Sequence, residues 1–170
     1  MNQEYKNSLF YITMKIHKEP VSSRPVVSCV NTFNEVFSKW LDYQMKKLLP
    51  ICTSYIKDSD ELLDKINSIG DLPPSARLST ADAVSMYTNI DTDTGIRTFR
   101  AIFDNFGNKI PTAFPKSLFL RILHIVMCNN TFAFGDTYWH QLEGFEMGIS
   151  CTCMYYILVY LFYEETKIIP

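Results

Sequence analysis

The alternation of apolar and polar residues near the start of the chain predicts two strands. Phe10, Ile12 and Met14 fall on one face of residues 9–14, which is the period of a half-buried strand. Residues 26–30 predict a second strand. The segment KIHKEPVSSRP between them holds two prolines and two serines, so we expect a loop or hairpin connection there.

The next two segments carry apolar residues at helical spacing. Thr32, three residues before Glu35, forms a capping box for a helix that Pro50 ends. Asp58 caps a second helix, which ends at Gly70. The apolar stripe of this second helix is Leu62, Leu63, Ile66 and Ile69. Both stripes are typical of helices that contribute to a core.

A short strand and two further helices are predicted in the middle of the chain. Residues 78–82 have the pattern of a short strand. An apolar stripe over residues 96–106 is closed by Gly107, and Pro115 suits the first position of a helix over residues 115–128.

The last third of the chain predicts a hairpin followed by a buried helix. Alternating aromatic residues at 131–134 and 137–141 flank the pair Gly135-Asp136, which is typical of a tight hairpin. An apolar run predicts a helix from Ser150 to Thr166. Strands and helices without a regular βαβ order favour an α+β fold.

The composition is that of one folded domain. The chain has 170 residues, of which 47% are hydrophobic and 20% charged. Its formal net charge is −2, so composition gives no general argument for nucleic-acid binding. Charge is uneven, however, because residues 1–50 hold seven bases and four acids, a net charge of +3. An anion could meet the chain at this end.

The five cysteines form neither a metal-binding nor a disulfide pattern. Their number is odd, no CxxC pair occurs and the chain has three histidines. A zinc site or a disulfide scaffold is therefore not expected, and a reducing compartment fits best. The apolar run over residues 149–163 is shorter than the roughly 20 residues needed to span a bilayer. No signal-peptide pattern occurs at residues 1–6, so an intracellular location without a membrane partner is expected.

Asp82 is the first candidate for chemistry. It is the last residue of the strand predicted at residues 78–82, and a carboxylate at the end of a strand can hold Mg²⁺, which prefers oxygen ligands. Tyr87 follows five residues later, where an aromatic ring can lie under a bound ribose. The alternative is that Asp82 caps the turn that follows it.

Two further segments could serve the same ligand. Lys15 and Arg24 lie in the segment predicted to connect the two strands, and a Lys–Arg pair on a hairpin can clamp nucleotide phosphates. The alternative is a solvated charged loop. Residues 144–148, GFEMG, form a glycine-containing turn that lets a backbone, a base or a template strand come close. The alternative is an ordinary turn before a helix.

Together these segments resemble the reverse transcriptase domain of Penelope-like retroelements. FYITMKIHK resembles the family's Tyr-x-x-PKIHK block, and RPVVSCVNTFNEVFSKWLDYQMKKLLP resembles its RP-[IV]-VS block with the helix that follows. SYIKDSDELLDKI and LSTADAVSMYTNIDTDTGI match the family pattern closely. NTFAFGDTYWHQLEGFEMGISCTC resembles the segment that leads into the family's GxAMG turn. The resemblance covers residues 9–165.

The resemblance implies roles for individual residues. Asp82 matches the first catalytic, metal-binding aspartate of motif A, and Ala83 would lend a backbone carbonyl to the same metal. Tyr87 matches the aromatic residue that excludes a ribose 2′-hydroxyl and so favours deoxynucleotides. Lys15 and Arg24 match the residues of the fingers that hold the incoming triphosphate.

The motif B turn is the other part of the implied nucleotide site. Met147 and Gly148 match the turn that contacts the nascent base pair, and Gln141 belongs to the approach to that turn. The resemblance also implies Mg²⁺ or Mn²⁺ as cofactor in a complete form of the enzyme, an RNA template, a DNA primer and deoxynucleoside triphosphates. A nuclear location follows from the resemblance alone.

The implied fold is the fingers and an incomplete palm of a right-hand polymerase. Residues 1–75 correspond to the fingers and residues 76–170 to part of the palm, with motif A at 76–90 and the motif B turn and helix at 141–166. We expect the motif A strand to keep an unpaired edge, which makes the chain marginally stable or prone to aggregation.

Three departures from the family pattern limit the expected activity. Met14 stands in place of a proline, and Ile149 and Cys153 replace the Thr and Pro of the family's MGT-x-x-x-P run. No Asp-Asp pair occurs, and no aspartate follows Asp136. One carboxylate cannot anchor the two metals of phosphoryl transfer. We therefore expect a fragment of an RNA-directed DNA polymerase that is inactive as this chain alone. The alternative is a non-catalytic nucleic-acid-binding protein or a decayed retroelement remnant.

Overall fold

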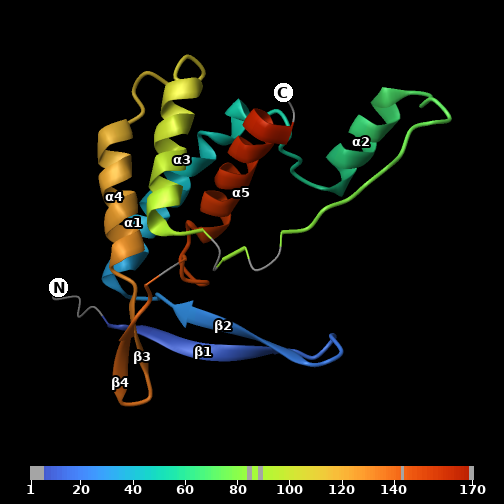
Figure 1. The fold of residues 1–170 in the computed structure, drawn as a ribbon. Coiled ribbons are helices and arrows are strands. Elements are labelled where there is room, and N and C mark those ends of the chain that lie inside the picture. The colour runs from blue at the N-terminus through green and yellow to red at the C-terminus, as the bar shows by residue number, and fades with distance from the viewer. Residues whose placement is uncertain (1–5, 84–85, 88–89, 143, 169–170) are drawn as a thin grey trace.

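A four-stranded sheet lies beside a bundle of helices in the computed structural model, which describes residues 6–83, 86–87, 90–142 and 144–168 (Figure 1). The strands are β1 (Ser8–Lys15), β2 (Ser22–Ser28), β3 (Thr131–Phe134) and β4 (Thr137–His140). The α-helices are α1 (Phe33–Lys46), α2 (Ser59–Ile69), α3 (Thr92–Asn105), α4 (Lys116–Cys128) and α5 (Thr152–Tyr163). A short 3₁₀ turn, η1 (Leu49–Ile51), follows α1, and a π-helical turn, η2 (Glu164–Ile168), follows α5. The α+β class is confirmed.

The sheet joins strands from both ends of the sequence in the order β2-β1-β3-β4. β1 pairs with β2 in antiparallel and with β3 in parallel register, and β3 and β4 form an antiparallel hairpin. The predicted hairpin is confirmed, and Gly135 adopts φ 60° at the first central position of its turn. Figure 1 shows the long β1–β2 ribbon reaching out beyond the helical bundle.

The predicted start of the second strand is wrong. β2 begins at Ser22 rather than Val26, so half of the expected loop belongs to the ladder and Pro25 pairs with Ile12. A proline cannot donate a hydrogen bond to a central strand, but β2 lies at the edge of the sheet, where proline is tolerated. The connection between the strands is therefore shorter than the sequence indicates.

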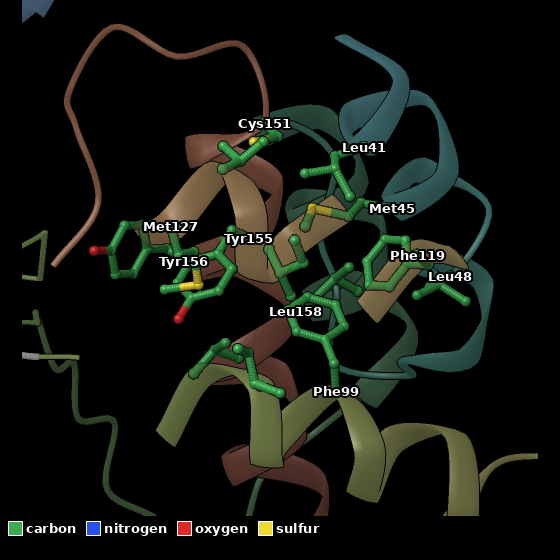
Figure 2. Packing of buried hydrophobic residues seen from close by; sticks show 14 of the residues in the cluster. Leu41, Met45, Leu48, Phe99, Phe119, Met127, Cys151, Tyr155, Tyr156 and Leu158 are labelled. Atoms are coloured by element: carbon green, nitrogen blue, oxygen red, sulfur yellow. The ribbon is translucent and has the colours of Figure 1, made fainter. Parts of the chain in front are cut away.

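The core lies where four helices meet. α1 and α3 both contact α4 and α5, and Figure 2 shows aromatic and aliphatic side chains of all four helices filling the space between them. The largest side chains buried here are Leu41, Met45, Leu48, Phe99, Phe119, Leu123, Met127, Tyr155, Tyr156 and Leu158. Aromatic rings run in contact from Phe103 through Phe119 and Phe99 to Tyr155. Among the described residues, no helix is long and apolar enough to cross a membrane.

The predicted start of α1 is correct, but its cap is different from the capping box that the sequence suggests. The Thr32 hydroxyl donates to the Cys29 carbonyl at 2.8 Å instead of accepting from the helix. Glu35 accepts from the backbone N–H of Asn31 at 2.6 Å. The carboxylate thus reaches back one residue further than expected. The helix ends at Lys46, and the predicted stop at Pro50 falls inside η1.

α2 is a well-capped helix that contributes nothing to the core. Asp58 accepts from the N–H of Glu61 at 3.0 Å, and Gly70 ends the helix with φ 73°. However, no residue of α2 is buried, and Figure 1 shows it standing apart from the other helices.

The strand predicted at residues 78–82 is wrong. Residues 70–83 contain no strand and are exposed throughout, with Leu78 94% exposed. A strand needs a neighbour to accept and donate its backbone hydrogen bonds, and none lies beside this segment in the described part of the chain. The residues at 78–82 have the sequence pattern of a strand, but no described strand pairs with them.

Candidate nucleotide-binding cleft

A cleft of about 610 Å³ opens between the β1–β2 ribbon and the segments that precede α3 and α5. Its lining residues are Lys15, Lys18, Ser23, Arg24, Pro25, Asp82, Ala83, Met86, Tyr87 and Met147. Six of the eight site residues predicted from the sequence therefore meet in one place, although 132 positions separate the first from the last (147 − 15 = 132). The predicted motif A also includes residues 84–85 and 88–89, which lie outside the described residues.

The ribbon supplies a basic wall. Lys15 is opposite Ser22 in the ladder, and Arg24 follows Ser22 by two residues. Directly opposed residues and residues two apart share a face of a ribbon, so Lys15 and Arg24 project to the same side. Lys18 lies in the turn that joins the strands and donates its backbone N–H to the Lys15 carbonyl at 3.3 Å. None of these three cations forms a salt bridge with a residue that the structure describes.

Tyr87 also lines the cleft and is held by contacts with α5. The Tyr156 hydroxyl donates to the Tyr87 carbonyl at 2.8 Å, and the Phe145 N–H donates to the same oxygen at 3.3 Å. The rings of Tyr87 and Tyr156 meet edge to face, with centroids 4.9 Å apart. Burial and the neighbouring Cys153 thiol raise the pKa of the Tyr87 hydroxyl, and the charge of Arg24 partly opposes this. The ring is thus fixed beside the basic wall.

The predicted motif B turn is anchored on β2. The Val27 N–H donates to the Met147 carbonyl at 3.1 Å, and Met147 lines the cleft. Gly148 adopts φ 148°, and a Cβ there would overlap the Val27 carbonyl oxygen. The sequence predicts that this turn lets a backbone, a base or a template strand come close. In the structure, the backbone of Val27 is what comes close to Gly148. Gly148 does not line the cleft itself.

Gln141 belongs to a smaller pocket that adjoins the cleft. This pocket, of about 140 Å³, is lined by Phe10, Pro25, Val27, Tyr87, Phe132, Gln141, Phe145 and Met147. It shares Pro25, Tyr87 and Met147 with the cleft, so the two hollows adjoin at these residues. Gln141 therefore lies near the cleft but does not line it.

Glu146 is a buried acid that sequence reasoning assigned no role. Its side chain is 1% exposed; Oε2 accepts from the Cys29 Sγ at 2.9 Å, and Oε1 has no hydrogen-bond partner among the described residues. Burial raises the pKa of Glu146 to about 7. Burial, reinforced by the carboxylate, also raises the pKa of the Cys29 thiol. Glu146 therefore sits at the base of the turn as a titratable group inside the protein.

The described residues do not fit a two-metal centre. Asp82 is the single carboxylate among the residues that line the cleft, and Ala83 can add one backbone carbonyl. In the described residues, no group of three or more His, Cys, Asp and Glu side chains could hold a metal ion. Two-metal phosphoryl transfer requires more oxygen ligands than this cleft supplies. What the arrangement can do is bind an anion against three cations beside an aromatic ring.

Four residues line the cleft but were not among the predicted site residues: Lys18, Ser23, Pro25 and Met86. Pro25 lies in the RPVVS segment that carries part of the resemblance. Lys18 had a signal in the sequence, because it lies in the same basic segment as Lys15. Ser23 and Met86 had none, since nothing in their spacing marks them. No known protein-family model matches this chain, and a search of curated proteins found no match.

Proposed function

We propose that this chain is the nucleotide-gripping part of an RNA-directed DNA polymerase of a retroelement, and that its cleft holds the triphosphate of an incoming deoxynucleotide. The observation that carries the proposal is the meeting of Lys15, Arg24 and Tyr87 in one cleft. The resemblance assigns these three residues to triphosphate and sugar contacts, although 72 positions separate Lys15 from Tyr87 in the sequence (87 − 15 = 72).

The chemistry of the cleft suits a nucleoside triphosphate. Arg24 can offer two parallel N–H donors to one phosphate, and Lys15 and Lys18 can add point charges. Such charge-assisted contacts contribute roughly 1.5–3 kcal/mol each. The Tyr87 ring, fixed by Tyr156, offers an apolar platform for the sugar. The bulk of the ring leaves less room for a ribose 2′-hydroxyl than for the hydrogen of a deoxyribose.

Binding without turnover is the activity that we propose for the chain by itself. Asp82 is the one carboxylate of the cleft, and nucleotidyl transfer by two metals needs further carboxylates. The same observation favours a second candidate, a non-catalytic protein that binds nucleic acid along the basic ribbon. That candidate requires binding of an RNA–DNA duplex that weakens steeply as salt concentration rises.

The experiment is a titration of the purified chain with a fluorescent deoxynucleoside triphosphate in Mg²⁺ buffer. Arg24→Ala and Lys15→Ala should each weaken binding by roughly tenfold or more, from the loss of one charge-assisted contact. Lys39→Ala is the matched control, because Lys39 is a lysine of α1 that pairs with Glu35 outside the cleft. Tyr87→Ala should reduce the ratio of deoxynucleotide affinity to ribonucleotide affinity.

Three outcomes distinguish the candidates. Equal losses from Arg24→Ala and Lys39→Ala would show that the cleft is not the binding site. Binding of an RNA–DNA duplex without nucleotide binding would favour the second candidate. Primer extension by the chain alone, abolished by Asp82→Ala, would contradict the expected inactivity.

A further inference from the structure

Glu146 is buried directly beside a residue of the cleft. Its neighbour Met147 lines the cleft, whereas the Glu146 side chain is 1% exposed. Two hydrogen bonds fix the turn that carries both residues. The Val27 N–H donates to the Met147 carbonyl at 3.1 Å, and the Thr152 hydroxyl donates to the Glu146 carbonyl at 2.8 Å. A movement of the Glu146 side chain would therefore displace the backbone that positions Met147.

The surroundings of this carboxyl group favour its neutral form. Oε2 accepts a hydrogen bond from the Cys29 Sγ at 2.9 Å, and Oε1 has no hydrogen-bond partner among the described residues. Glu146 forms no salt bridge with a described residue. Burial raises its pKa to about 7, and the hydrogen bond from Cys29 opposes this only in part. An ionised carboxylate in this position would be a buried charge with one donor and no cation.

The titratable groups around the Cys29–Glu146 pair do not supply the missing positive charge. Burial raises the pKa of the Cys29 thiol and of the Cys151 thiol, so both stay neutral at physiological pH. The negative charge of Glu35 in α1 raises the pKa of Cys29 further. Lys39 is already paired with Glu35 at 2.6 Å. Ionisation of Glu146 would thus add a second negative charge to this region without a partner.

A small hollow beside this pair offers an ionised carboxylate a way towards water. The hollow measures about 50 Å³ and is lined by Cys29, Val30, Glu35, Ser38, Gly148, Ile149 and Ser150. Of these residues, Val30, Gly148 and Ser150 are exposed. Gly148 lies so close to the Val27 carbonyl that the turn has no slack against β2. A carboxylate that moves into the hollow would therefore shift the turn on β2.

We propose that Glu146 is a positioning residue for the cleft: its neutral carboxyl keeps the turn on β2 with Met147 at the cleft, and release of its proton to solvent displaces Met147 and weakens nucleotide binding. The inference rests on the proposed function and adds a proton-linked control to it. Apparent affinity scales with the fraction of the chain in the binding-competent form. For a group that titrates at about pH 7, the neutral fraction falls about tenfold between pH 6 and pH 8.

Titration of the full chain with a fluorescent deoxynucleoside triphosphate in Mg²⁺ buffer at pH 6 and pH 8 tests the proposal. The ratio of the Kd of the unaltered chain to the Kd of Glu146→Gln should rise about tenfold between these pH values. This ratio cancels the titration of the probe's own terminal phosphate, which is the same for both proteins. Glu61→Gln, a change at a surface carboxylate of α2 outside the cleft, should keep the pH dependence of the unaltered chain. A constant ratio, or an equal loss of pH dependence in Glu61→Gln, would overturn the inference.

The NMR signal of the Met147 methyl group gives a readout that needs no nucleotide. In the unaltered chain this signal should shift with a midpoint at about pH 7, and in Glu146→Gln it should stay constant. Its loss in Met147→Leu assigns it, and the methyl group of Met45, fully buried in the helical core, is the internal control. A Met147 signal that ignores pH, or that shifts equally in Glu146→Gln, would contradict the inference. If neither protein binds the nucleotide, the proposed function fails, and the methyl titration alone decides whether Glu146 positions Met147.

Discussion

The helical bundle and residues 58–83 carry similar signals in the sequence but differ completely in burial. Leu123 of α4 is fully buried, whereas Ile66 of α2 is 49% exposed. Both residues lie on apolar stripes of helical period, and α2 has the better N-cap, with Asp58 accepting from Glu61. The difference is that α4 has α1 and α3 beside it. An amphipathic stripe thus shows that a helix needs a partner, not that the chain provides one.

The largest expected effect comes from truncating one aliphatic side chain on each side of this comparison. Leu123→Ala should destabilise the chain by about 4 kcal/mol, because it deletes buried methyl groups and leaves a cavity. Ile66→Ala in α2 should change the free energy of unfolding by less than about 0.5 kcal/mol in dilute solution. Urea unfolding followed by circular dichroism measures both. Similar losses for the two variants would mean that α2 contributes to the cooperative core.

The same contrast explains how much of the fold could be predicted from the sequence. Helix periods, the Gly135 turn and the Asp58 cap are local signals, and the elements that they predict are present. The strand at residues 78–82 depended on a neighbour elsewhere in the chain, and it is absent. Pro25 was interpreted as a loop residue because the edge position of β2 is a property of the whole sheet.

The candidate site depended even more on tertiary structure. Nothing in the spacing of Lys15, Tyr87 and Met147 shows that they meet; the resemblance suggested it, and the cleft contains all three. Glu146 could not have been found in this way, because an isolated glutamate usually indicates an exposed position. Its burial follows from the anchoring of the turn on β2, where Gly148 allows the two backbones to approach.

Glu146 gives the second largest expected effect, a dependence of stability on pH. Burial raises its pKa from about 4.5 to about 7 in the folded chain, so the folded state holds this proton where the unfolded state has released it. The free energy of unfolding should therefore fall as pH rises from about 4.5 to about 7, by up to about 3 kcal/mol. Glu146→Gln should remove this slope and make the chain more stable at pH 8.

Glu61→Gln is the control for that prediction, because Glu61 is a surface carboxylate of α2 whose pKa is lowered, not raised, by the Lys57 N–H and by Lys65. In the Glu61→Gln variant, the free energy of unfolding should still decline between pH 4.5 and pH 7. A decline that persists in Glu146→Gln would assign the titration to another group.

The third expected effect compares two glycines. Gly95 of α3 faces α5 so closely that a Cβ would overlap the Tyr155 hydroxyl, whereas a Cβ at Gly70 meets open space. Gly95→Ala should cost about 2 kcal/mol or more through overpacking. Gly70→Ala should cost about 1 kcal/mol from its positive φ alone, and it should affect α2 rather than the bundle. Thermal unfolding and hydrogen exchange distinguish a global loss from a local one.

The smallest expected effects come from two neighbouring tyrosines of α5. Replacing each by phenylalanine should change the free energy of unfolding in opposite directions. The Tyr155 hydroxyl is buried without a hydrogen-bond partner among the described residues, whereas the Tyr156 hydroxyl donates to the Tyr87 carbonyl. Tyr155→Phe should stabilise the chain by about 1 kcal/mol, since it removes an unsatisfied polar group. Tyr156→Phe should destabilise it by a similar amount, and it should also weaken nucleotide binding through Tyr87.

In the Tyr155→Phe background, Gly95→Ala should cost less than in the unaltered chain, because the hydroxyl that a Cβ would overlap is gone. Equal costs in the two backgrounds would show that α3 and α5 are kept apart by other contacts.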